Sequence, residues 1–380
     1  MRVAIYTDYA YHRIGSEVYA ERAFAVFLAR LAPFLDRCVV VGRVTEEGSR
    51  ARYPLGERIE FVPLPFYARL SSPLPVAKAL VGSLRAFSRV LDEVDCVWLL
   101  GPHPFAFAFA ALARARGKNV VLGVRQDLPE YVRNRHPGNR LIGLAGAVLE
   151  HGFRLLGRTC STIAVGPQLA ANYRHSRRVL QLTVSLVDGA DIVDPADRAD
   201  DFSGVREVLS VGRLDSEKNP LLMADVLAGL ERAEPGRWRL VICGEGRLEG
   251  ELRERLATLG VADRADLRGY LAHDQLAATY ASAQLLLHVS WTEGLPQVLY
   301  EAFAAALPAV ATDVGGIGAA VGDAVTLIPP GDPDRAIAAL RELADSPELR
   351  RRRVEAGHAL VSEATIEAEC RRVAGFLGSA

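Results

Sequence analysis

Residues 292–302 read TEGLPQVLYEA and place two glutamates, Glu293 and Glu301, eight positions apart. Glu301 is the only charged residue from Leu295 to Ala311, so this apolar run predicts a buried helix that begins near Pro296. An ionised carboxylate there costs roughly several kcal/mol unless a partner satisfies it. We expect Glu293 in the loop before the helix and Glu301 about one turn inside it. A ligand with hydroxyls and phosphates fits two carboxylates beside the positive end of a helix.

The same order of strand, loop and helix repeats along the 380-residue chain. In the first half, apolar β-branched runs predict strands at 3–7, 38–41, 60–62, 96–100, 120–124 and 162–165, and amphipathic runs predict helices at 17–31, 76–91, 105–116 and 142–155. In the second half, we predict strands at 207–211, 239–243, 265–267, 285–289, 309–312 and 325–328, and helices at 219–231, 247–259, 275–282, 297–306 and 333–344. This alternation is typical of parallel sheets covered by helices. We therefore predict an α/β fold with two doubly wound, Rossmann-like domains facing across a cleft.

The boundary between these domains is expected in residues 188–203, which are acidic and poor in apolar side chains. The charge divides there too: residues 1–195 hold 25 Lys and Arg against 17 Asp and Glu, a net of +8, and the remainder holds 20 against 29, a net of −9. We predict an N-terminal domain at 1–190 and a C-terminal domain at 204–362. The basic first half is either a solvated surface or a surface that meets an anionic acceptor or lipid.

Composition excludes several classes of protein. Five cysteines, none in paired spacing, argue against a disulfide framework and a zinc site and favour a reducing compartment. The chain starts at once with a strand-like run, and no stretch reaches the roughly 18 apolar residues of a membrane-spanning helix. We therefore expect no signal peptide and a cytoplasmic location. No nucleic-acid recognition motif accompanies the basic residues, so nucleic acid is not an expected partner.

Further glycine and cation motifs follow predicted strands of the second half. Residues 211–220 read VGRLDSEKNP, so Gly212 is followed by two cations, Arg213 and Lys218, that suit a pyrophosphate. Residues 243–247 read CGEGR, where Gly244 begins either a phosphate-binding loop or a tight turn. Residues 312–317 read TDVGGI, and their two glycines permit close approach of a ligand.

These motifs together resemble retaining glycosyltransferases of the GT-B fold, family 4. The resemblance also includes RGYL at 268–271, LPAVAT at 307–312 and PPGDP at 329–333. It is specific over residues 205–345 and looser over the first 200. It implies that the N-terminal domain is on the acceptor side and that the C-terminal domain binds a nucleotide sugar. The final helix, within 363–380, resembles the family segment that crosses back to the N-terminal domain.

The resemblance implies a role for each matching residue. Arg213 and Lys218 would bind the nucleotide diphosphate and stabilise it as it leaves, Glu301 would bind the ribose hydroxyls, and Glu293 would bind the donor sugar. The backbone N–H groups of the following helix start and the loop beside the base would complete the donor site: Gly294, Leu295, Gln297, Val298, Gly269, Tyr270 and Leu271. Such enzymes need no bound metal or cofactor, since Arg and Lys neutralise the leaving group.

The first half offers weaker candidates. Gly15 follows the first strand and is expected to open a helix near the phosphates, or else to form an ordinary turn. His103 ends a strand and is either a contact to the donor sugar, which would make it catalytic, or a structural histidine. Arg125 stands where the family often has a histidine, and we expect Arg125 and Asp127 to contact donor or acceptor. Asp8 and His12, in the first loop, are candidate acceptor contacts.

The function predicted from these residues is retaining, metal-independent transfer of a sugar from a nucleotide-diphosphate sugar to a hydroxyl group. UDP is favoured over GDP as the nucleotide on family frequency. The acceptor is a saccharide, a cyclitol or another small molecule, or a lipid reached by peripheral membrane contact through the basic first half and residues 66–70. The alternatives are a sugar-nucleotide epimerase or a phosphorylase with the same architecture, or a protein that binds nucleotide sugars without catalysis.

Overall fold

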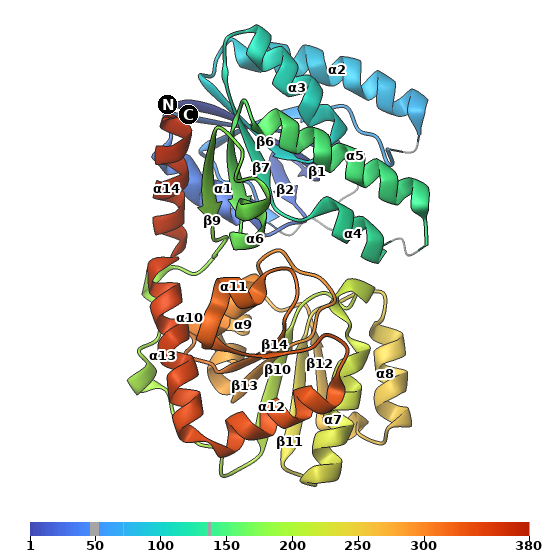
Figure 1. Ribbon diagram of the computed structural model, residues 1–380, viewed down its shortest axis with the longest axis vertical. Helices are drawn as coiled ribbons and strands as arrows, with labels where there is room; N and C mark the ends of the chain where they lie inside the picture. The colour runs from blue at the N-terminus through green and yellow to red at the C-terminus, as the bar shows by residue number, and fades with distance from the viewer. Residues whose placement is uncertain (46–52, 71, 136–137, 380) are drawn as a thin grey trace. The chain divides into compact units, whose positions relative to one another are not determined.

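The computed structural model describes residues 1–45, 53–70, 72–135 and 138–379. The chain divides into two compact units, which Figure 1 shows by residue colour. The first unit consists mainly of Met1–Val132, Gly138–Val184 and Ile366–Ala380, and the second mainly of Ser185–Thr365. The last helix, α14 (Ile366–Gly378), therefore belongs to the first unit although the chain reaches it from the second.

The first unit is built on a parallel sheet whose strands lie in the order β5-β3-β1-β6-β7-β8-β9. These strands are β1 (Arg2–Ile14), β3 (Arg37–Thr45), β5 (Ile59–Leu64), β6 (Cys96–Gly101), β7 (Asn119–Val124), β8 (Ser161–Val165) and β9 (Arg178–Leu182). Two short strands, β2 (Glu17–Ala20) and β4 (Tyr53–Pro54), extend the sheet in antiparallel fashion from the far end of β1. The strand order reverses at β1, as in a doubly wound sheet.

The predicted helix at 17–31 was wrong in its first half. The first strand continues to Ile14 and returns through the turn at Gly15 as β2, with Ile14 opposite Glu17. Helix α1 begins only at Phe24 and ends at Leu31. Gly15 has a φ of +62°, which explains a glycine at this turn, but it lies at the tip of a hairpin and opens no helix.

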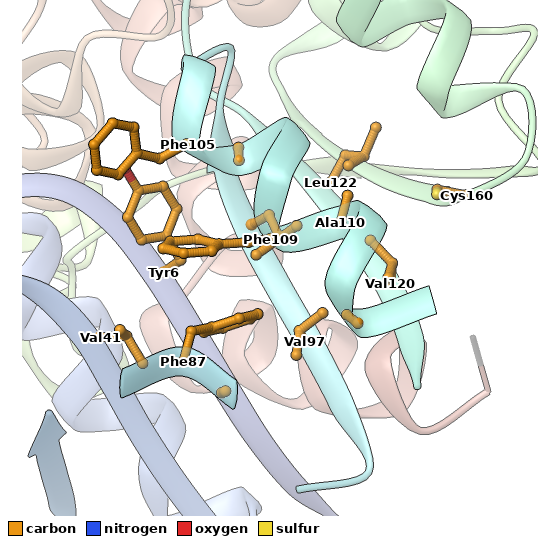
Figure 2. Close-up of a cluster of buried hydrophobic side chains, with 14 of the residues drawn as sticks. Tyr6, Val41, Phe87, Val97, Phe105, Phe109, Ala110, Val120, Leu122 and Cys160 are labelled. Carbon is orange, nitrogen blue, oxygen red and sulfur yellow. The ribbon is translucent and has the colours of Figure 1, made fainter. Parts of the chain in front are cut away.

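Helices cover both faces of the first sheet. Besides α1 they are α2 (Pro73–Leu91), α3 (Pro104–Ala115), α4 (Leu128–Arg135), α5 (Arg140–Gly157) and α6 (Pro167–Asn172). Figure 2 shows the core between the sheet and α2 and α3, where the rings of Phe87 and Phe109 stack at a centroid distance of 4.3 Å. The ring of Tyr6 meets Phe109 edge to face. This apolar packing fixes the ends of β1 and β6, where the polar residues of this unit begin.

The second unit is a six-stranded parallel sheet in the order β12-β11-β10-β13-β14-β15. Its strands are β10 (Arg206–Val211), β11 (Trp238–Cys243), β12 (Ala265–Gly269), β13 (Leu285–His288), β14 (Ala309–Thr312) and β15 (Val325–Ile328). Its helices are α7 (Leu221–Ala233), α8 (Glu249–Thr258), α9 (His273–Ser282), α10 (Gln297–Ala304), α11 (Ile317–Val321), α12 (Pro333–Asp345) and α13 (Pro347–Glu363). All six strands predicted in this half are present, and the prediction of two doubly wound α/β domains is confirmed.

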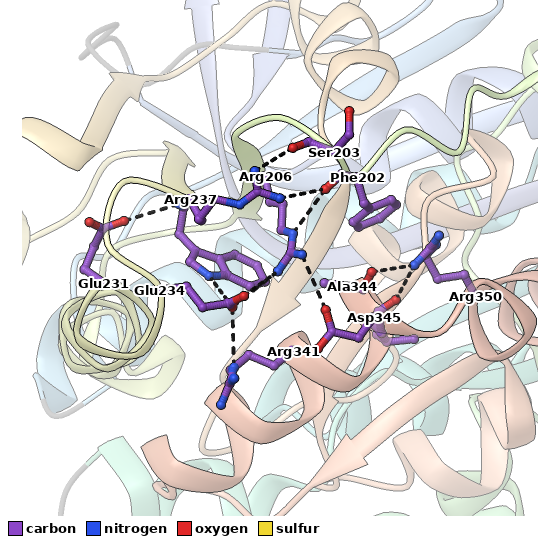
Figure 3. A network of polar contacts seen from close by, with 12 residues as sticks. Phe202, Ser203, Arg206, Glu231, Glu234, Arg237, Arg341, Ala344, Asp345 and Arg350 are labelled. Atoms are coloured by element: carbon purple, nitrogen blue, oxygen red, sulfur yellow. Dashed lines mark hydrogen bonds and ion pairs between the residues drawn. The ribbon is translucent and has the colours of Figure 1, made fainter.

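A buried arginine network closes the edge of the second sheet at which its strands begin (Figure 3). Arg206, the first residue of β10, lies over the ring of Trp238, the first residue of β11, at 5.0 Å. Its guanidinium contacts Glu234 at 3.3 Å and Asp345 at 3.4 Å, so the charge is paired although the side chain is buried. The neighbouring strands β10 and β11 are therefore tied together where they begin, and the residues described next lie beyond the opposite, carboxyl ends of the strands.

Candidate functional site

The residues predicted to bind phosphates and hydroxyls meet where the order of the second sheet reverses. β10 and β13 are neighbours in that sheet but are separated in sequence by two strands, so the loops that follow them diverge to opposite sides. Ligands of doubly wound sheets bind at such a point, beyond the carboxyl ends of the strands. The loop after β10 carries Arg213 and Lys218, and the loop after β13 carries Glu293.

Glu293 is the centre of this site. The ammonium of Lys218 donates to its Oε1, the hydroxyl of Ser290 donates to the same oxygen at 2.6 Å, and Nε2 of His288 lies 2.9 Å from it. Ser290 is in turn held by Thr312 at the end of β14, whose hydroxyl donates to the Ser290 carbonyl oxygen at 2.8 Å. Only 9% of the Glu293 side chain and 23% of the Lys218 side chain are exposed. The carboxylate is thus fixed from three sides.

The pKa of Glu293 shows how strongly these neighbours act. Burial alone raises the pKa of this carboxyl, but the charge of Lys218 and the hydrogen bond with His288 outweigh it and bring the pKa well below its usual range. Glu293 is therefore ionised across the physiological pH range. An ionised, acceptor-only carboxylate is suited to accept hydrogen bonds from the hydroxyl groups of a ligand.

Arg213 is held by two carboxylates of its own loop. Its guanidinium contacts Asp215 and also Glu217, the latter at 2.6 Å. The carbonyl oxygen of Glu217 accepts a hydrogen bond from the backbone N–H of Trp291 at 2.9 Å, which joins the loop after β10 to the loop after β13. Arg213 and Lys218 also belong to the lining of one small cavity of about 20 Å³, together with His288 and Ser290.

Two glycines permit the loops to pack this closely. A Cβ at Gly244, after β11, would overlap the carbonyl oxygen of Gly212, after β10. A Cβ at Gly315 would overlap the carbonyl oxygen of Glu293, and Gly315 has a φ of +61°. The sequence left open whether Gly244 begins a phosphate loop or a turn, and it predicted ligand approach at Gly315. Contacts between loop backbones account for both glycines in this structure.

Glu301 lies within α10, one turn after its start, and Glu293 lies in the preceding loop, as predicted. The hydroxyl of Tyr280, at the end of α9, donates to Oε2 of Glu301 at 2.7 Å. Burial raises the pKa of Glu301, and the hydrogen bond from Tyr280 opposes that rise. One oxygen of this carboxylate therefore accepts a hydrogen bond inside the protein, and this bond offsets part of the free-energy cost of burying the carboxylate.

The other predicted donor contacts surround the same loops. Gly294 and the buried Leu295 lie in the loop before α10, and Gln297 and Val298 form its first turn. The carbonyl oxygen of Gly269 accepts from the backbone N–H of Gly244 at 2.7 Å. Tyr270 and Leu271 follow it, and Tyr270 is exposed. The second unit thus gathers the predicted donor residues of the second half around the carboxyl ends of its strands.

His103 in the first unit has the contacts of a structural histidine. It caps the start of α3, where its Nδ1 accepts from the backbone N–H of Phe105 at 3.2 Å. Nδ1 also lies 2.9 Å from the hydroxyl of Tyr6, and Nε2 lies 3.0 Å from the hydroxyl of Tyr67. Burial lowers the pKa of His103 to about 4, so the ring is neutral near pH 7. Both ring nitrogens are engaged within the unit, which favours the structural alternative.

Asp8 and Arg125 lie together at the carboxyl end of the first sheet. The guanidinium of Arg125 is 3.5 Å from the Asp8 carboxylate and lies over the ring of Tyr9 at 4.6 Å. Burial lowers the pKa of Arg125, and the charge of Asp8 opposes this effect. Nε of Arg125 is buried without a hydrogen-bond partner. This pair therefore stays a candidate for contacts to an anionic or hydroxylated ligand.

The two remaining candidates of the first half have local structural roles. The carboxylate of Asp127 accepts from the backbone N–H of Glu130 at 3.1 Å, at the start of α4, and from the amide of Asn172 at 3.4 Å. His12 lies on β1, inside the long first strand, with Nε2 3.0 Å from Glu21. These contacts account for both side chains without a ligand.

Sequence reasoning missed three side chains of the site. His288 ends an apolar strand run, where a histidine is more often a core residue than a ligand; it is buried, and its partner is Glu293. His288 and Ser290 are two positions apart at a strand end, and side chains at this spacing point to the same side, so this signal was present. Tyr280 had no such signal, because its contact with Glu301 depends on how α9 packs against α10.

Two kinds of feature are absent from residues 1–45, 53–70, 72–135 and 138–379. Nowhere in them do three or more His, Cys, Asp or Glu side chains gather in a way that could hold a metal ion. Within the same ranges, no helix has both the length and the apolar character needed to cross a membrane.

Comparison with known proteins agrees with this geometry. Residues 197–359 match the family described as glycosyl transferases group 1. Over 344 residues the chain is 25% identical to the sulfoquinovosyl transferase of Arabidopsis thaliana, an alignment that covers 86% of this chain and 64% of that protein. The chain therefore spans less than two thirds of the length of this relative.

Solved structures resemble the whole chain at low sequence identity. The sucrose-phosphate synthase of Thermosynechococcus elongatus has a TM-score of 0.76 at 16% identity, covering 100% of this chain and 98% of that one. HepE of Anabaena, in complex with UDP-glucose, has a TM-score of 0.72 at 16% identity and covers 100% of both chains. The chain accordingly has the GT-B fold that the sequence predicted.

Proposed function

We propose that the chain is a retaining glycosyltransferase that moves a sugar from a nucleotide-diphosphate sugar, with UDP as the favoured nucleotide, to a hydroxyl group of an acceptor. The observation that carries this proposal is the pairing of Lys218 with Glu293 at the reversal point of the second sheet. A cation and an ionised carboxylate side by side match the two chemistries of such a donor, phosphate and sugar hydroxyl. The names of the matched family and of the relatives support it.

In the proposed reaction, the bond between the sugar C1 and the diphosphate oxygen breaks, and a bond between C1 and the acceptor oxygen forms on the same face of the ring. The diphosphate leaves with the electron pair of the broken bond, and the acceptor hydroxyl gives its proton to an oxygen of the leaving diphosphate. Lys218 and Arg213 would stabilise the negative charge that develops on the diphosphate, so no metal ion is invoked. Both cations are matched by carboxylates in this structure, and a diphosphate would compete for them.

Glu293 would bind the donor-sugar hydroxyls and Glu301 the ribose hydroxyls. The donors around Glu293 keep it ionised and fixed, so it is prepared to accept these bonds without rearrangement. The start of α10 presents backbone N–H groups between the two carboxylates, which suits a phosphate. Asp8 and Arg125 of the first unit are our candidates for acceptor binding. UDP is favoured because the similar HepE structure is a complex with UDP-glucose.

The first test is thermal unfolding with UDP, GDP, ADP and TDP. A ligand at 100 times its Kd adds about 2.7 kcal/mol of stability, so we expect UDP to raise the Tm and the Lys218→Ala variant to lose that rise. Absence of a shift with all four nucleotides would overturn the proposal.

A second test uses donors labelled in the sugar, with and without candidate acceptors. A labelled glycoside with the donor's anomeric configuration that forms only when acceptor is present is the expected product. A labelled isomer of the donor without acceptor identifies an epimerase, and a sugar phosphate that forms with inorganic phosphate identifies a phosphorylase. Nucleotide binding without any product identifies a protein that binds nucleotide sugars without catalysis.

A further inference from the structure

Helix α5 of the first unit presents its apolar side to the solvent. Leu141, Leu144, Val148 and Leu155 are spaced by three, four and seven residues and therefore lie along one side of the helix. Their exposed fractions are 80%, 64%, 62% and 45%. Single exposed leucines are ordinary, but a row of apolar side chains along one side of a helix, interrupted here at His151 and Gly152, marks an interaction surface. We call these four residues the α5 stripe.

The orientation of α5 is fixed by its opposite side. That side buries Phe153, whose ring packs edge to face on Phe107 of α3 at a centroid distance of 5.6 Å. It also buries Gly157, where a Cβ would come within 2.6 Å of the Ser176 hydroxyl, so the glycine permits close packing. Rotation of the helix to bury the stripe would break these contacts. The stripe is therefore exposed because of how α5 is seated on the unit.

The stripe belongs to a larger basic layer. Helices α2, α3 and α5 follow one another across one face of the first sheet, joined by the Phe87–Phe109 and Phe107–Phe153 contacts (Figure 1). These three helices carry six basic residues, Lys78, Arg85, Arg89, Arg114, Arg140 and Arg154. They carry a single acidic residue, Glu150, which is buried and paired with Arg154. The exposed charge of this layer is positive only.

The outward side of α2 combines both features. Leu74, Lys78, Val81 and Arg85 lie along one line of the helix at spacings of four, three and four residues, and all four are exposed. Residues Ala79 and Phe87, on the opposite side, are buried. Apolar side chains flanked by cations on two helices of the same layer are typical of surfaces that lie in the interface of an anionic membrane.

We propose that the α2-α3-α5 layer docks on an anionic lipid bilayer, with the α5 stripe inserted among the lipid headgroups and the cations facing the lipid charges. The exposed positive charge argues for lipid over a second copy of this chain, because two such layers would repel each other. A docked α5 would lie in the plane of the membrane and need not cross it. This inference does not rest on the proposed catalytic function.

The test is flotation of the full chain with vesicles of phosphatidylcholine alone or with about 30% phosphatidylglycerol, an anionic lipid. The wild type is expected to float with the anionic vesicles. The double variant L144Q/V148Q should bind at least about tenfold more weakly, because two apolar side chains no longer leave water. The double variant R85Q/R140Q should lose roughly fivefold per arginine, and this difference should vanish at about 1 M salt.

Two control variants lie in the second unit. Val205→Gln removes an exposed apolar side chain, and Arg351→Gln removes an exposed cation. Neither should change flotation, and the Tm of every variant reports its folding. A wild type that floats with neither vesicle overturns the proposal. So does a wild-type dimer in sedimentation velocity that L144Q/V148Q converts to monomer, since the stripe would then bind a second copy. Flotation needs no donor or turnover, so this proposal and the catalytic one fail separately.

Discussion

Lys218 and Glu293 are 75 residues apart in the chain, and their side chains form an ion pair at the point where the second sheet reverses its order. Lys218 lies in the loop after β10 and Glu293 in the loop after β13, and these are the two central strands of the sheet. Under the proposed function, Lys218 would bind the phosphate of the donor and Glu293 its sugar hydroxyls, so this contact would join the two binding chemistries.

Removal of the carboxylate charge should weaken folding in a pH-dependent way. The pKa of Glu293 in the folded chain lies below its unfolded value of about 4.3, so its stabilising effect is complete above that pH and is lost as the pH falls through the folded pKa. Glu293→Gln should lower stability by about 2 kcal/mol at pH 7 and flatten the acid side of the stability curve. Denaturant unfolding between pH 3 and 8 measures this. Glu355→Gln, in an exposed pair with Arg351, is the control and should change little.

Loss of either cation should lower turnover. Arg213→Ala and Lys218→Ala should each reduce kcat of sugar transfer by roughly 10²-fold or more, because a donor to the developing phosphate charge is gone. Arg351→Ala, an exposed arginine of the same unit, should leave kcat unchanged. Unfolding curves confirm that each variant is folded at the assay temperature. Near-full turnover in both site variants would contradict the assigned role.

Removal of the Tyr280 hydroxyl should act through Glu301. The pKa of Glu301 is raised by burial, and Tyr280→Phe should raise it further because a donor to the carboxylate is lost. A raised carboxyl pKa means stability that is present below about pH 4.3 and declines as the pH rises through the folded pKa. The variant should therefore lose about 1–2 kcal/mol at pH 8 and less at pH 4.5. Tyr19→Phe, which breaks a surface hydrogen bond to Glu17, should show no such pH dependence.

Gly315 should tolerate no side chain. Gly315→Ala adds a Cβ that overlaps the carbonyl oxygen of Glu293 and also strains a residue with a φ of +61°. Gly260, after α8 of the same unit, has a φ of +73° with no described atom within 4 Å of such a Cβ, so Gly260→Ala shows the cost of strain alone, about 1–2 kcal/mol. We expect Gly315→Ala to exceed that cost and to weaken nucleotide binding. Equal losses in the two variants would mean that the overlap is relieved at no cost.

His103 should make the protein sensitive to mild acid. Its folded pKa of about 4 lies below the unfolded value of about 6.5, so its stabilising effect is present above pH 6.5 and is lost as the pH falls toward 4. The loss amounts to at most about 3 kcal/mol. His103→Gln should remove this part of the pH dependence, whereas a change at the exposed His175 should not. If His103→Gln leaves the curve between pH 4 and 6.5 unchanged, the buried neutral ring is not its cause.

The second half was predicted more fully than the first because its signals are local. Its strands are short and mostly apolar, and β15 was predicted at its observed bounds. In the first half, the helix predicted at 17–31 was half wrong because β2 pairs with the distant end of β1, and such pairing leaves no periodic mark on a four-residue strand. Helix α13 was missed because its run of arginines reads as solvated, although Arg350 is buried against Asp200 and two backbone carbonyl oxygens.

The sequence alone determined which residues carry charge and hydroxyl chemistry at strand ends, because a polar side chain beside an apolar strand is visible without a structure. It placed Glu293 before a helix and Glu301 inside it, and it identified Arg213 and Lys218 as cations on one loop. Only the tertiary structure decided their partners. Lys218 meets Glu293 and Tyr280 meets Glu301 because a parallel sheet brings the ends of separate strands and helices together, and hydrogen-bond partners distant in sequence follow from packing and not from local pattern.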